Sequence, residues 1–168
     1  MDAIAVLHEL AGRIPGEVRR AVEGLTPEQL VARPGEGANT IGWLVWHLAR
    51  VQDHHVSELL GVDQLWATGE WSAAFGLAPD PDDTGYGHDP DDVASVRPAS
   101  VQALLAYADA AQARMVEHLG TLTDADLDCV VDERWDPPVT LGVRLVSVAD
   151  DAIQHAGQAA YVRGLLGA

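Results

Sequence analysis

Four long segments of the sequence carry apolar residues at the spacing of one face of an α-helix. Between them lie stretches rich in Gly, Pro and Asp, which favour turns, and no stretch of useful length alternates apolar and polar residues as a strand would. The helical segments are residues 2–24, 40–60, 100–119 and 140–166. This pattern predicts an all-α protein, a four-helix bundle with a long crossover between its second and third helices.

The predicted helix boundaries rest on residues with capping preferences. Thr40, Ser100 and Thr140 each precede a helical segment and can accept a hydrogen bond from its first turn. Gly61 can end the second helix in a left-handed conformation. The short sequences "LTPEQL" (25–30) and "LTDADL" (122–127) resemble each other, and we expect each to form one short turn after a long helix.

The crossover, residues 62–98, is long for a connection in a compact domain, and such connections are either functional or disordered. Its second part, "APDPDDTGYGHDPDD", is a poor helix or strand former. Its aromatic residues indicate that it packs back onto the bundle; they are Trp66, Trp71, Phe75 and Tyr86. The sequence leaves open whether this segment is a lid or a contact in a homodimer.

Length and charge limit the class of protein. A chain of 168 residues predicts a single domain, residues 1–168. The net charge of −16 argues against nucleic acid and anionic membranes, because both need a basic face. Cys129 is the only cysteine, so no disulfide within the chain is expected, and the start of the sequence lacks the features of a signal peptide. We therefore expect a cytoplasmic protein.

The last helical segment contains unexpected polar residues in the run "DDAIQHAGQAAYVRG" (150–164). Asp151 and His155 are four residues apart, so they share one helix face. This spacing suits two ligands of one metal ion, although a plain hydrogen bond between them is the simpler interpretation. Asp150 points about 100° away and is expected to be solvated, or to serve as a general base near the site.

A third ligand would have to come from another helix, and the second helix offers His47 in its most apolar part. His54 lies about 10.5 Å further along the helix, too far to bind the same ion with His47. Arg50 follows His47 on the same stripe, where it could hold a substrate carboxylate or pair with Asp53 or Asp151. Candidate walls of a cofactor pocket are Trp43, Trp46 and Trp135, with ordinary packing as the alternative.

The stretches "NTIGWLVWHLARVQDHH" and "DDAIQHAGQAAYVRGLL" resemble motifs of the DinB-like (YfiT-like) superfamily of metal-binding four-helix bundles. His47 matches the histidine of that family's second helix, and His155 matches the final histidine of its fourth helix. Position 151, where the family usually has His, is Asp here. The resemblance therefore implies a metal site of His47, Asp151 and His155, in which a carboxylate replaces one imidazole.

The resemblance also implies a function. Members of the superfamily include metal-dependent thiol S-transferases that use bacillithiol or mycothiol, and the Arg-only, Ala-rich composition is typical of an actinobacterial host of mycothiol. We expect a divalent metal, preferably Zn²⁺, with Ni²⁺, Fe²⁺ or Mn²⁺ as alternatives. The expected partners are a small thiol and an electrophile in detoxification. Two alternatives remain: a metal-dependent hydrolase with Asp150 as general base, and a non-enzymatic metal-binding stress protein.

Overall fold

The computed structural model describes residues 1–69 and 71–168, and four long helices form its body. These are α1 (Ala3–Val22), α3 (Ile41–Leu60), α6 (Val101–Leu119) and α7 (Leu141–Leu166). The predicted four-helix bundle is confirmed. The side chains of Thr40, Ser100 and Thr140 accept hydrogen bonds from the first turns of α3, α6 and α7, and Gly61 ends α3 with a φ of 65°.

Short elements connect the long helices. They are α2 (Pro27–Leu30), α4 (Leu65–Thr68), the 3₁₀ turns η1 (Ser72–Phe75) and η2 (Asp124–Asp128), α5 (Pro90–Ser95), and the strands β1 (Val130–Asp132) and β2 (Val139–Thr140). The two similar sequences, "LTPEQL" and "LTDADL", form α2 and η2, and each turn is closed by a capping box from its threonine.

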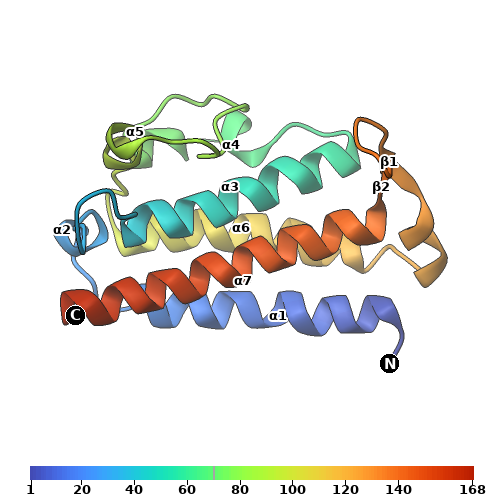
Figure 1. The fold of residues 1–168 in the computed structure, drawn as a ribbon, viewed down its shortest axis with the longest axis horizontal. Helices are drawn as coiled ribbons and strands as arrows, with labels where there is room; N and C mark the ends of the chain where they lie inside the picture. The colour runs from blue at the N-terminus through green and yellow to red at the C-terminus, as the bar shows by residue number, and fades with distance from the viewer. Residues whose placement is uncertain (70) are drawn as a thin grey trace.

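The direction of the helices explains the long crossover. Figure 1 shows α1 and α7 running one way along the bundle and α3 and α6 running the other way. Because α3 and α6 are parallel, the chain must travel back along the whole bundle between them. It does so over the outer side of α3, where α4 and α5 lie (Figure 1). The helices α3 and α1 each pack against both α6 and α7, so α1 and α3 are diagonal.

Small residues bring α7 close to α3. Ala152, Ala156 and Ala159 are buried on one side of α7 and belong to the same core cluster as Trp43 and Trp46 of α3. Alanine side chains allow two helix axes to approach closely, since interaxial distance depends on the side chains at the contact. The polar residues on either side of this alanine stripe are therefore held near α3.

The crossover is packed onto the bundle through Trp66 and Phe75, which are fully buried. Trp66, Phe75 and Tyr107 of α6 form a cluster of tilted and edge-on rings. Tyr86, which we expected to pack as well, is instead 94% exposed. The Asp- and Pro-rich part was also predicted to lack helix, but Asp89 caps α5 and Pro90 occupies its first turn, where proline is favoured.

A second difference lies between η2 and α7. The sequence shows no strand pattern there, yet β1 and β2 pair antiparallel, with Val130 opposite Thr140. Two strands of three and two residues are too short for the alternation that identifies a strand in a sequence. Among the described residues, no helix is both long enough and apolar enough to cross a membrane.

Candidate metal centre

His47 lies on the side of α3 that faces α7 and is buried. Its ring stacks on Trp43 one turn earlier, with 4.7 Å between the ring centroids and 7° between the planes. Its Nδ1 lies 2.5 Å from the carbonyl oxygen of Thr84. A carbonyl can only accept, so Nδ1 carries the proton and Nε2 has the free lone pair that a metal requires.

Asp151 and His155 approach His47 from α7. The ring centroids of His47 and His155 are 4.6 Å apart, and Nε2 of His47 is 3.7 Å from Oδ1 of Asp151. Nδ1 of His155 donates to the backbone oxygen of Asp151 at 2.9 Å, whereas the Asp151 carboxylate oxygen is 3.6 Å away. The simple hydrogen bond between the Asp151 and His155 side chains is therefore not formed, and Nε2 of His155 keeps its lone pair.

These three side chains fit a divalent metal ion. Each offers one ligand atom, and the three atoms lie within 4.8 Å of one another. Ligands about 2.1 Å from a tetrahedral zinc are roughly 3.4 Å apart, close to the observed separation of His47 and Asp151. The second carboxylate oxygen of Asp151, Oδ2, is buried and has no hydrogen-bond partner among the described residues. A buried carboxylate oxygen without a partner is costly, and a cation would satisfy it.

The crossover closes over this cluster at Thr84 and Gly85. Gly85 has a φ of +89°, and a Cβ atom placed there would be 2.9 Å from Nδ1 of His47 and 2.9 Å from Trp46. Only glycine allows the backbone to pass this close in this conformation. The loop thus fixes both the orientation of the His47 ring and which nitrogen carries its proton.

Arg50, predicted as a catalytic group, is completely buried. It donates to the backbone oxygens of Pro81 and Asp83 at 3.0 and 2.9 Å, and it lies 3.5 Å from Asp53. This placement agrees with the alternative prediction that Arg50 pairs with Asp53. Arg50 therefore holds the crossover loop that carries Thr84, rather than a substrate carboxylate.

Asp150, the other predicted catalytic residue, is exposed and accepts a hydrogen bond from Gln154 at 2.7 Å. It lies outside the cavity beside the cluster. The three tryptophans predicted to line a pocket lie in different environments. Trp43 stacks on His47, Trp46 is buried in the core, and Trp135 lines the cavity with 66% of its surface exposed.

His88 lies in the crossover loop and joins the wall behind His47. Its Nδ1 accepts a hydrogen bond from Nε1 of Trp43 at 3.0 Å, and its Nε2 donates to Asp83 at 2.9 Å. Its ring also stacks on Trp46. The sequence signal for this role was slight: a histidine and two glycines in an otherwise acidic loop.

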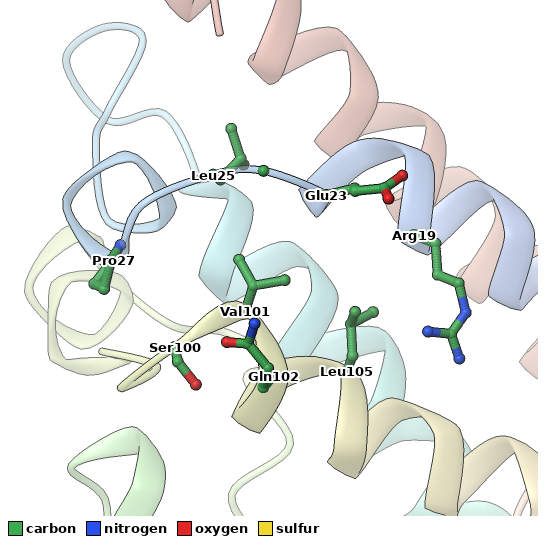
Figure 2. A pocket seen from close by; sticks show the side chains of 9 residues that line it. Arg19, Glu23, Leu25, Pro27, Ser100, Val101, Gln102 and Leu105 are labelled. Atoms are coloured by element: carbon green, nitrogen blue, oxygen red, sulfur yellow. The ribbon is translucent and has the colours of Figure 1, made fainter.

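A cavity of about 600 Å³ opens beside the cluster. Its lining comes from α3, α7, the crossover and the loop between β1 and β2, and consists of His47, Val51, His54, His55, Asp82, Thr84, Tyr86, Trp135 and Asp151. A separate hollow of about 400 Å³ lies between the end of α1 and the start of α6 (Figure 2). It contains none of the predicted site residues, and Arg19 at its edge is paired with Asp109.

A sequence model of the DinB superfamily matches residues 12–159 of this chain. The chain belongs to the DinB superfamily. A search of curated proteins finds no match to this DinB protein. Its fold is similar to the crystal structure of a conserved protein from Enterococcus faecalis, with 33% identity, a TM-score of 0.91, and coverage of 100% of this chain and 99% of the other.

A second similar structure is YfiT from Bacillus subtilis, described as a probable metal-dependent hydrolase with an unusual four-helix bundle topology. It is 20% identical, with a TM-score of 0.66, and the match covers 98% of the present DinB protein and 87% of YfiT. At this identity the likeness supports the shared fold. The match of the family model over residues 12–159 confirms the predicted membership of the DinB-like superfamily.

Proposed function

We propose that this protein is a metal-dependent enzyme that joins a low-molecular-weight thiol, preferably mycothiol, to an electrophile in the cytoplasm. The observation that carries the proposal is the cluster of His47, Asp151 and His155 at the edge of a large cavity. Three protein ligands leave coordination positions free, which is the arrangement of catalytic rather than structural metal sites. Two imidazoles and one carboxylate suit Zn²⁺, and also Ni²⁺, Fe²⁺ or Mn²⁺.

Each residue of the site has a role that follows from its contacts. His47 and His155 would offer Nε2 to the metal because their Nδ1 atoms are held by backbone oxygens. Asp151 would offer its carboxylate and balance part of the metal's charge. A divalent metal lowers the pKa of a coordinated thiol, so that the nucleophilic thiolate is present at neutral pH. The cavity of about 600 Å³ is large enough for a drug-sized thiol and its electrophile.

The position of Asp150 favours thiol transfer over hydrolysis. A general base assists metal-dependent hydrolysis by taking a proton from the attacking water, and Asp150 was the residue expected to do this. Asp150 is instead exposed and bonded to Gln154. Thiol transfer depends less on such a base, because a thiol is far more acidic than water to begin with and, once bound to a metal, would release its proton to solvent.

Hydrolysis is the second candidate because Asp82 lines the same cavity and carries a carboxylate that could act as a base. The description of YfiT as a probable metal-dependent hydrolase points the same way. In that reaction the cavity would hold an ester or amide, and no thiol would be consumed.

The first experiment measures metal in protein purified without a metal-affinity tag, alongside His47→Ala, Asp151→Ala and the control His8→Ala. The proposal expects near-stoichiometric metal in the parent and control, and its loss in both site variants. The metal-loaded protein is then mixed with monochlorobimane and mycothiol, and separately with p-nitrophenyl acetate alone. Conjugation that requires the thiol supports the proposal, ester cleavage without thiol supports the hydrolase, and neither activity supports a non-enzymatic metal-binding protein.

A further inference from the structure

The cavity has two ends that differ in chemistry. One end holds His47 and Asp151, and the other holds His54 and His55. His55 follows His47 by eight residues on α3, which is about 12 Å along the helix axis. A molecule whose reacting atom lies at the metal cluster therefore reaches His55 with its remote end.

The proton of the His55 ring is fixed by Arg144 of α7. NH1 of Arg144 is 2.7 Å from Nδ1 of His55, and a guanidinium can only donate. Nδ1 therefore accepts, and Nε2 carries the hydrogen. Arg144 itself is 8% exposed and is held by Asp132 at 2.8 Å and by Glu58 at 3.0 Å. Among the described residues, Nε2 of His55 has no acceptor, so it is an oriented N–H donor.

This end of the cavity is not a second metal centre, although His54, His55 and Glu58 also place ligand atoms within 4.8 Å. The Arg144 guanidinium already occupies the Nδ1 lone pair of His55, so this lone pair is not free to bind a cation. Burial, followed by the charge of Arg144, lowers the pKa of His55 to about 4. The ring is thus neutral near pH 7 and offers a donor without a positive charge.

The remaining lining selects against an anion. Asp82 contributes a carboxylate to the cavity, and no arginine is among the described residues that line it. The charge of Arg144 is balanced by Asp132 and Glu58. Trp135 and Tyr86 add aromatic surface at the opening, where they are 66% and 94% exposed. Aromatic surface in the same cavity as an uncharged N–H donor suits a hydroxylated group such as a polyol or a sugar.

We propose that His55 is a specificity-determining residue whose Nε2–H binds an oxygen of an uncharged, hydroxyl-rich group at the remote end of the thiol substrate. The inference rests on the proposed function, because the substrate's sulfur is taken to lie at the metal cluster. The loss of one such hydrogen bond on a partly buried donor corresponds to a change of about 10-fold in affinity.

The test uses the Co²⁺-loaded protein and follows the sulfur-to-cobalt charge-transfer band in the near ultraviolet. Mycothiol, which carries a sugar part, is titrated against N-acetylcysteinamide, an uncharged thiol that lacks it. The parent protein should bind mycothiol about 10-fold more tightly. His55→Phe should abolish this preference and leave both the N-acetylcysteinamide Kd and the cobalt d–d bands unchanged. His55→Gln, which keeps an N–H donor, should restore part of the preference, and His8→Phe should retain all of it.

The outcomes separate the two proposals. If both thiols give the band with equal Kd in the parent, or if His55→Phe keeps the preference, the role of His55 is wrong while thiol binding stands. If neither thiol gives a band in the parent, the thiol function and the inference built on it both fail. Should His55→Phe alter the d–d bands, His55→Gln is used alone. If this variant is fully metal-loaded and keeps at least part of the mycothiol preference, the donor role is supported, and complete loss of the preference overturns it.

Discussion

Replacing Gly85 by alanine tests how far the crossover loop controls the metal centre. Gly85 has a φ of +89°, and an added Cβ would meet Nδ1 of His47 at 2.9 Å. Gly87, two residues on, has a φ of +79° but nothing within 4 Å of such a Cβ. The two substitutions therefore impose similar backbone strain, and only Gly85→Ala pushes against His47.

The expected magnitudes follow from this difference. Alanine in a left-handed conformation costs about 1–2 kcal/mol, and both variants should lose this much free energy of unfolding. Gly85→Ala should lose a further ~1–3 kcal/mol, because neither the stacked His47 ring nor buried Trp46 can easily move. Displacing the loop also removes the Thr84 oxygen from Nδ1 of His47. Loss of such an outer contact typically weakens metal binding by about 10–100-fold.

The measurements are urea unfolding of the metal-free variants and competition with a chromophoric zinc chelator. Gly87→Ala should keep the parent's zinc affinity, and Gly85→Ala should lose at least about 10-fold. Equal zinc affinity in the two variants would refute the claim that the loop positions His47. Equal stability would show that the loop retreats without strain.

Three further changes probe the site. Asp151→Ala should abolish the stabilisation of the protein by zinc, which is about 2.7 kcal/mol at a zinc concentration of 100 times the Kd. Without metal, this variant should be at least as stable as the parent, because a buried oxygen without a partner is removed. A clear drop in its metal-free melting temperature would contradict this. Arg50→Met should lower the free energy of unfolding by about 3 kcal/mol. This is the low end for breaking a buried ion pair, because the Asp53 carboxylate keeps its contacts with Arg114, Tyr107 and two backbone N–H groups. An unchanged urea midpoint would argue that Arg50 does not anchor the crossover loop. The lowered pKa of His55 should make the protein lose stability as the pH falls from 6.5 toward 4, because the unfolded chain binds the proton first. In the folded protein the charges of Arg144 and His54 oppose protonation of His55, and that of Glu58 favours it. Because His55→Gln removes this titrating group, it should flatten the dependence of the melting temperature on pH.

The long helices and the pairing of Asp151 with His155 on one face of α7 were predictable because their signals are local. Three or four turns of apolar periodicity, with a threonine or serine before each helix, fix an element from its own residues. Asp151 and His155 are four positions apart on one helix, so their common face follows from helix geometry alone.

What escaped prediction depends on contacts between distant segments. Arg50 lies on the same stripe as His47, and only the folded crossover shows that its guanidinium meets the backbone oxygens of residues 81 and 83. Thr84 acts through its carbonyl, which every residue has, so no side-chain pattern reveals it. His55 depends on Arg144, a residue far along the chain in α7.

The ligands of the candidate centre come from α3 and α7, which are neighbours in space but far apart in the sequence. During biosynthesis the first histidine is therefore made long before its partners. The chain gains the ability to hold a metal only after the ribosome has released the segment up to His155 and α7 has docked. An ion bound at this centre would then tie α7 to α3, so metal uptake would report that these two helices have docked.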